Sequence, residues 1–241
     1  MIDWLKRNPR ESPVIEIDGQ VLPIVIRRLG NARRMTLRVA PDGSEVHLSL
    51  PRWGRTAEAL AFAHSRRDWL AEQLAAVPRA QIPEAGGVIH YRGEVLRIEH
   101  TQEGRRKPQV ADGVIRIGGP AESLAARLKR WLEAEARLLL AEDLAFYCTL
   151  AGHIAPKLAL SNARRRWGSC GPDGAIRINW RLVMAPDAVR RSVVAHEVAH
   201  LVHFDHSPRF HALLAELFEG DLAQANAWLK REGRGLYSSF G

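Results

Sequence analysis

Residues 196–200 of this chain read His-Glu-Val-Ala-His and lie in a mostly apolar run at 193–202. Side chains four positions apart in a helix project from one face, so His196 and His200 can both reach one cation. Glu197 then lies beside that cation, where its carboxylate can take a proton from water. An apolar helix is expected to be buried, and buried His and Glu side chains need partners. The pattern therefore predicts a helix with two metal ligands and one catalytic carboxylate.

The third ligand is sought downstream, because a catalytic zinc ion usually has three protein ligands and one open position. His203 would lie about 10 Å along a straight helix from His196, too far for one ion, so we expect it behind the ligands or facing solvent. His206 comes just before Ser207 and Pro208, and Pro suits the first turn of a helix. The chain can therefore break after His203 and return His206 to the metal. We choose His206 as the third ligand.

Other side chains are alternative candidates for the third metal ligand. Glu216 or Glu219 on the next helix would give a gluzincin-like ligand set, and His211 is a further candidate. Imidazole nitrogens suit zinc, so we expect one Zn²⁺ per chain, although another divalent metal can occupy the same ligands.

A site of this kind predicts a metal-dependent hydrolase that uses activated water, with Glu197 as the general base. We expect a metalloprotease acting on a peptide or protein. The alternative is a hydrolase of an anionic small molecule, a nucleoside triphosphate or another phosphate ester, whose charge the arginine clusters would hold. A nucleic-acid-associated protease is a third hypothesis, although no recognition motif for nucleic acid is found.

The segment before this helix has its own pattern. Strands are expected at 157–160 and 175–179, on either side of the sequence Arg-Trp-Gly-Ser-Cys at 166–170. We expect Gly168 to allow a close backbone approach, and Cys170 to be a buried, inert thiol. Arg166 has two roles open to it, a structural ion pair or the binding of an oxyanion, carboxylate or phosphate.

The rest of the chain alternates between the periods of strands and helices. Helical periodicity is expected at 56–77, 121–151, 188–203, 208–218 and 222–230, and short strands at 14–17, 21–28, 35–39, 45–50, 88–91, 94–99 and 114–117. The sequence therefore predicts an α+β protein. We place a β-rich N-terminal region at 1–118 and the metal-dependent hydrolase domain at 119–241.

Composition excludes several classes of protein. The chain has 241 residues, 46% hydrophobic and 26% charged, which excludes wholesale disorder and collagen-like repeats. Two cysteines cannot form a disulfide framework. No apolar run approaches the 18 or so residues of a membrane span, and the first residues lack the apolar region of a signal peptide. We therefore expect a cytoplasmic protein without a membrane partner. Its net charge of +8 favours anionic partners without identifying one.

Four blocks of the sequence resemble the YgjP-like metallopeptidase family, which is related to the SprT-like and WLM metalloproteases. The blocks are RWGSC at 166–170, INWRL at 178–182, HEVAHL at 196–201, and DHS at 205–207 with Phe210. The resemblance implies a zincin-like, minigluzincin-type domain with an HExxH helix. It also implies His196, His200 and His206 as metal ligands and Glu197 as the catalytic residue. A strand within 167–179 would form the edge along which the substrate lies. Asp205 departs from the family pattern, which often has Asn there.

Overall fold

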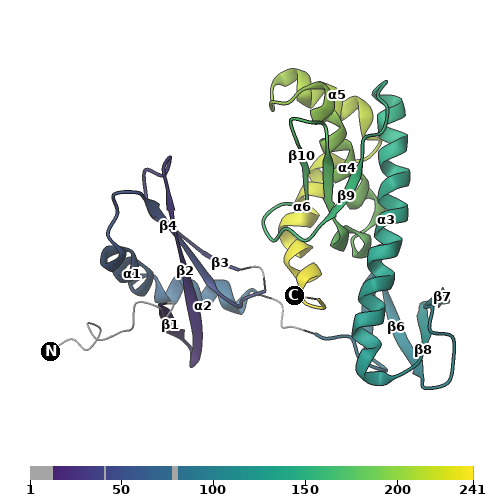
Figure 1. The fold of residues 1–241 in the computed structure, drawn as a ribbon, viewed down its shortest axis with the longest axis horizontal. Coiled ribbons are helices and arrows are strands. Elements are labelled where there is room, and N and C mark those ends of the chain that lie inside the picture. The colour runs from purple at the N-terminus through teal and green to yellow at the C-terminus, as the bar shows by residue number, and fades with distance from the viewer. Residues whose placement is uncertain (1–12, 41, 78–80, 241) are drawn as a thin grey trace. The chain divides into compact units, whose positions relative to one another are not determined.

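The computed structural model describes residues 13–40, 42–77 and 81–240 (Figure 1). The chain forms two compact units, Met1–Arg79 and Ala80–Gly241. The boundary expected after residue 118 therefore falls inside the second unit. The apolar side chains of the strands before it, such as Ile98 and Ile115, share one core with Leu128 and Leu132 of the following helix.

The first unit is a four-stranded sheet with two helices. Its elements are β1 (Val14–Ile17), β2 (Gln20–Leu29), β3 (Thr36–Val39), β4 (Val46–Pro51), α1 (Thr56–Ser65) and α2 (Arg67–Ala75). The strand order is β1-β2-β4-β3, and β2 runs parallel to β4. The single helix expected at 56–77 is two helices, because Arg66 leaves the helical region with φ −109° and ψ 23°. Buried side chains of Ile24, Leu48 and Leu70 form part of the core.

The second unit begins with another four-stranded sheet. Its strands are β5 (Val88–Tyr91), β6 (Glu94–Thr101), β7 (Gln109–Ala111) and β8 (Val114–Gly118), in the order β5-β6-β8-β7. Turns at Arg92-Gly93 and Asp112-Gly113 join neighbouring strands, and all four residues have positive φ. Two such residues in succession make the tight hairpin turn whose twist matches that of the strands. Strand β7 was not expected from the sequence.

Helix α3 (Leu124–Leu150) runs the length of the second unit, from the β5–β8 sheet at one end to the remaining helices at the other (Figure 1). Its buried stripe repeats with helical spacing and includes Leu128, Leu132, Ala136 and Leu140. The helix therefore carries one continuous core through the whole unit.

A three-stranded sheet and three helices complete the second unit. The strands are β9 (Leu158–Ser161), β10 (Gly168–Cys170) and β11 (Ile176–Asn179), and the helices are α4 (Asp187–Val202), α5 (Pro208–Leu217) and α6 (Leu222–Glu232). Short 3₁₀ segments lie at Ala121–Ser123, Trp180–Met184 and Gly233–Tyr237. The order β10-β11-β9 leaves β10 at an edge. The protein is α+β, as expected, and none of its described helices is both long and apolar enough to cross a bilayer.

Buried charges fix the start of α4. Arg190 Nε lies 2.7 Å from Asp143 Oδ2 of α3, and the two side chains are 4% and 5% exposed. Arg190 also pairs with Asp187, which accepts hydrogen bonds from Arg92 in the β5–β6 turn. The backbone N–H of Arg92 donates to the carbonyl oxygen of Val183. Helix α4 is thus tied at its first turn to α3 and to the neighbouring sheet.

Candidate metal centre

Helix α4 carries His196, Glu197 and His200, and the chain reverses soon after it. The helix ends at Val202, and α5 begins at Pro208, as the sequence predicts. The side chain of Ser207 caps α5 by accepting a hydrogen bond from a backbone N–H of its first turn. The connecting segment brings His206 back over α4, with its Nε2 atom 3.3 Å from Nε2 of His196.

The three histidines form one cluster. One ring nitrogen from each of His196, His200 and His206 can be chosen so that all three atoms lie within 4.8 Å of one another. Zinc holds histidine nitrogens at about 2.0–2.1 Å, which in a tetrahedral site separates neighbouring ligand atoms by roughly 3.4 Å. A set of three imidazoles is also the chemistry that zinc accepts. The residues present therefore fit a zinc ion.

The ring of Phe210 packs against all three histidine rings of the cluster. This ring is fully buried, and its centroid lies 5.0 Å from that of His196, 4.5 Å from that of His200 and 4.8 Å from that of His206. A side chain that packs against three rings at once limits the rotamers of each. The first turn of α5 therefore orients all three imidazoles.

Hydrogen bonding and burial favour the neutral form of His196 and His200. Nδ1 of His200 lies 3.1 Å from the carbonyl oxygen of His203, which can only accept. This contact places the proton of His200 on Nδ1 and leaves the lone pair on Nε2 for a metal. Burial, with the charges of neighbouring histidines, lowers the pKa of His196 to about 4. The neutral ring is the form that binds a cation.

Glu197 points into a tightly enclosed place beside β10. Glu197 is only 5% exposed, and its carboxylate accepts a hydrogen bond from the backbone N–H of Cys170. A β-carbon on residue 168 would lie 2.4 Å from Oε1 of Glu197, so the expected close approach at Gly168 is confirmed. Burial raises the pKa of Glu197 to about 7, against the lowering effects of the Cys170 hydrogen bond and the Arg166 charge.

The other candidates from the sequence lie outside the cluster. His203 caps α4 and offers its carbonyl oxygen to His200. Glu219 instead accepts hydrogen bonds from Tyr147 and Arg191, and Glu216 is exposed on α5. The ring of His211 lies 6.3 Å from that of His206.

Arg166 and Cys170 flank the site without joining the cluster. Arg166 is exposed and forms no ion pair with any carboxylate in the described ranges, so a structural ion pair is not seen there. Its charge still acts on Glu197, which places it near the site. Cys170 is half-buried, so the expected full burial is not found. Its partial burial and the charges of Glu197 and Asp173 raise the pKa of the thiol, which agrees with an inert thiol.

Sequence reasoning missed a buried network that holds the segment before β10. Arg181 is fully buried, with its guanidinium stacked 4.6 Å from the ring centroids of both Trp180 and Tyr237. It donates hydrogen bonds to Asn162 and to the carbonyl oxygen of Phe240. These partners are up to 59 residues away, so no local pattern marks them.

A second set of bonds holds the same segment. The hydroxyl of Tyr237 donates to the carbonyl oxygen of Ala163, which also accepts from the side-chain amide of Asn179. The ring of Tyr237 packs 5.7 Å from that of Trp167. The C-terminal segment thus supports the loop that leads into β10.

Comparison with known proteins identifies the family of the chain. Residues 33–232 match the model of the YgjP-like family, described as a YgjP-like metallopeptidase domain. No curated protein and no solved structure matches the chain. The family match spans most of the sequence, including both sheets of the second unit and the three clustered histidines. The chain therefore belongs to the YgjP-like metallopeptidase family.

Proposed function

We propose that this protein is a zinc-dependent metallopeptidase in which His196, His200 and His206 hold the ion and Glu197 is the general base. The observation that carries the proposal is the clustering of three imidazoles near one buried carboxylate. A set of three ligands leaves a position open, as catalysis requires and a closed structural site does not.

The chain's own groups account for the proton transfers. Zinc bound there would lower the pKa of water and polarise the scissile carbonyl. Glu197 takes the proton of the attacking water on its carboxylate and delivers it to the leaving amine. The N–H of Cys170 and the close backbone at Gly168 orient that carboxylate. No side chain needs to form a covalent bond with the substrate.

Strand β10 is the proposed docking edge for an extended peptide. It is an edge strand, paired to β11 through Gly168–Cys170, and it lies directly against the catalytic carboxylate. A peptide that added a strand there would run past Glu197. The exposed guanidinium of Arg166 would bind a carboxylate of the substrate. A ligand helix packed beside such an edge is the arrangement of a zincin-like, minigluzincin-type domain.

Arg166 also favours one alternative, the hydrolysis of nucleoside triphosphates or other phosphate esters. Among the residues that the structure describes, no carboxylate pairs with this guanidinium, and such a group suits a phosphate as well as a carboxylate. The same histidines and Glu197 would serve that reaction.

Metal content tests the ligand assignment. Untagged protein is expected to contain one zinc per chain by plasma mass spectrometry, and His206→Ala is expected to lose most of it. His211→Ala is the matched control, because that histidine is exposed and lies outside the cluster. Zinc retained by His206→Ala, or lost equally by the control, would contradict the assignment.

Activity separates the two substrate classes. Zinc-loaded protein is expected to cleave casein or a peptide library, and Glu197→Gln is expected to lose that cleavage while keeping its zinc. Phosphate release from nucleotides without any peptide cleavage would support the alternative. Full peptide cleavage by Glu197→Gln would refute the assigned base.

A further inference from the structure

The sheet of the first unit gathers distant chain segments at one end. Strands β2 and β4 are parallel and in register, with Leu29 opposite Pro51, so both finish at the same edge. Strand β3 lies on the far side of β4 from β2. The loop at 30–35 that joins β2 to β3 must therefore cross the end of β4. It meets there the turn at 52–55 that leads into α1.

These segments are rich in arginine and free of acid. Residues 19–41 and 46–57 contain no Asp or Glu. Six arginines lie on the end of β2, in the loop at 30–35 and in the turn at 52–55. We call these six residues and Trp53 the arginine end; the arginines are Arg27, Arg28, Arg33, Arg34, Arg52 and Arg55. All six are exposed, and within the described ranges none of them lies within 4 Å of a carboxylate oxygen. Their charge is therefore available to an anionic partner.

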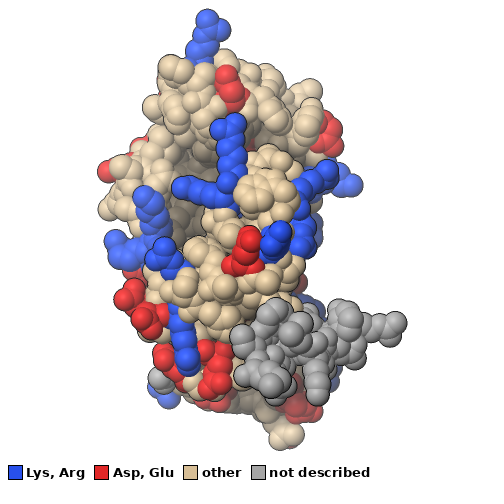
Figure 2. Space-filling view, turned by 90° about the vertical axis from the view of Figure 1, so that its left-hand side faces the viewer, with Lys and Arg blue, Asp and Glu red and all other residues tan. Residues whose placement is uncertain are grey.

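Two contacts show that the parts of the arginine end lie side by side. Nη2 of Arg28, on β2, donates to Oγ1 of Thr56 at the start of α1, at 2.7 Å. A β-carbon on Gly30, in the loop, would lie 3.6 Å from Nε of Arg52 in the turn. Strand, loop and turn thus form one continuous surface. In Figure 2, which looks at the left-hand side of Figure 1, Lys and Arg side chains project from the face turned to the viewer, with Asp and Glu side chains also on that face.

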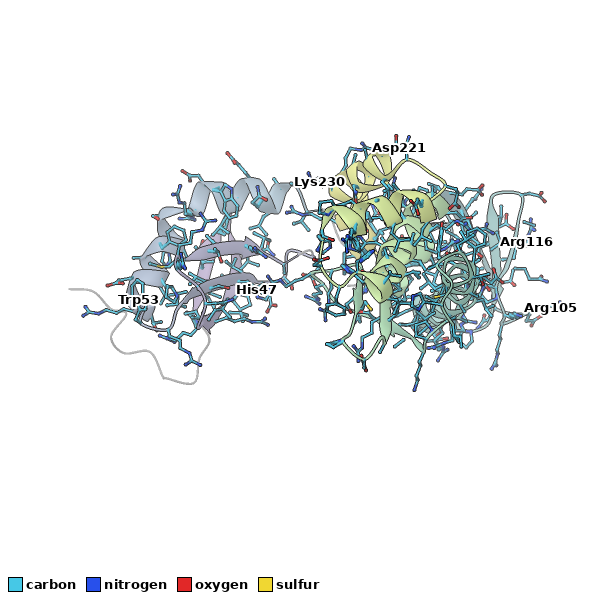
Figure 3. The ribbon with its side chains drawn as sticks, turned by 90° about the horizontal axis from the view of Figure 1, so that it is seen from above. His47, Trp53, Arg105, Arg116, Asp221 and Lys230 are labelled. Carbon is cyan, nitrogen blue, oxygen red and sulfur yellow. The ribbon has the colours of Figure 1, made fainter. Side chains whose placement is uncertain are left out.

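Trp53 lies in the middle of this run of charge. Its side chain is 79% exposed, and neighbouring Leu29 is 42% exposed. Figure 3 labels Trp53 at the outside of the first unit. A tryptophan with most of its surface in water presents a large flat ring on which a partner can stack. Because arginines flank Trp53, a ligand that has both a flat ring and negative charge would fit this surface.

We propose that the arginine end binds single-stranded nucleic acid, with its guanidinium groups on successive phosphates and Trp53 stacked on an unpaired base. Groups of cations that flank an exposed aromatic ring are how proteins bind single strands without reading their sequence. A duplex would offer the phosphates alone, because its bases are stacked on one another. The proposal concerns the first unit and does not depend on the peptidase activity of the second.

Fluorescence anisotropy of the full chain with a labelled 20-nucleotide strand tests the proposal. Trp53→Ala is expected to weaken binding about tenfold, since one stacked base contributes that much. Arg28→Gln with Arg55→Gln is expected to weaken it further and to lessen the salt dependence, by about 0.7 in the log–log slope for each lost contact. Arg137→Gln with Arg209→Gln removes the same charge from exposed positions of the second unit and is expected to change little.

Further probes distinguish stacking from plain attraction between charges. An abasic strand of the same length is expected to bind the wild type as weakly as the normal strand binds Trp53→Ala. RNA and DNA strands are compared to learn which sugar is preferred, and binding of either one supports the proposal. Equal binding of normal strand, abasic strand, heparin and anionic phosphatidylserine vesicles would overturn it. So would unchanged binding by Trp53→Ala or equal loss in the control variant. Thermal melting of each variant verifies that these exposed substitutions leave the fold intact.

Discussion

Gly168 and Glu197 are in such close contact that a β-carbon at position 168 would displace the glutamate side chain. The missing β-carbon would come within 2.4 Å of Oε1 and 2.6 Å of Cγ of the glutamate. The φ angle of Gly168 is not in the left-handed region, so the close approach of Glu197, and not backbone freedom, favours glycine here. Strand β10 and helix α4 are therefore fitted to each other at the carboxylate.

Gly168→Ala is expected to reduce kcat/KM for peptide cleavage at least tenfold, because Glu197 must move away from the attacking water. Zinc content should stay at one per chain, since the histidines are untouched. Gly235→Ala is the control, because nothing lies within 4 Å of its β-carbon position. Wild-type activity in Gly168→Ala would show that the position of the carboxylate does not limit the reaction.

Phe210→Leu is expected to weaken zinc binding about tenfold, as loss of groups that support metal ligands does. The smaller side chain no longer fills the space beneath His196, His200 and His206, while the swap between apolar residues costs about 1–1.5 kcal/mol of unfolding free energy. Competition with a chromophoric chelator measures the affinity. Phe218→Leu is the matched control, since Phe218 is also buried but does not contact these rings. Equal affinity in both variants would count against an orienting role.

Asp143→Asn is expected to lower the free energy of unfolding by roughly 3 kcal/mol, because it leaves the buried guanidinium of Arg190 with one acidic partner fewer. Urea denaturation followed by circular dichroism measures the loss. The neighbouring Glu142 is exposed, so Glu142→Gln should change the unfolding free energy by less than about 0.5 kcal/mol. A small effect at both positions would show that α4 does not depend on the buried pair.

Stability is expected to fall in acid partly through Asp187. Burial alone would raise its pKa, but hydrogen bonding to Arg92 and the charge of Arg190 lower it below the ordinary value of 3.8. A carboxylate with a lowered pKa stabilises the fold above the unfolded value and loses that effect as pH falls through the folded value. The melting temperatures of wild type and Asp187→Asn should therefore differ most above pH 5 and converge towards pH 3. A constant difference would contradict this linkage.

The helix with His196 and His200 and the break before Pro208 could be predicted from the sequence, because helical periodicity and proline act locally. The return of His206 follows from that break, and the structure brings it to His196. The role of Phe210 beneath the rings depends on how α5 packs on α4. In the sequence, Phe210 has the pattern of an ordinary core residue, so its packing against the histidine rings could not be predicted.

The boundary between the two units could not be predicted from strand content. The strands at 88–118 resemble the earlier ones in pattern, yet their apolar faces pack on α3. Which core a strand joins depends on contacts between distant residues, and the alternation of apolar residues shows only that one face is buried. The buried partners of Arg181 escaped prediction for the same reason.

The contact between Arg181 and Phe240 has a consequence for synthesis on the ribosome. Arg181 emerges with helix α4 close behind it, but the carbonyl of Phe240 and the ring of Tyr237 are made only 56 to 59 residues later. Until Tyr237 and Phe240 leave the exit tunnel, the guanidinium of Arg181, which is buried in the folded protein, remains in water. The loop before β10 then lacks the contacts that Tyr237 makes with it. The histidines of the nascent chain are therefore already made before strand β10 can take its position beside Glu197. The cleavage activity is therefore expected to appear only after residues 237–240 have left the tunnel.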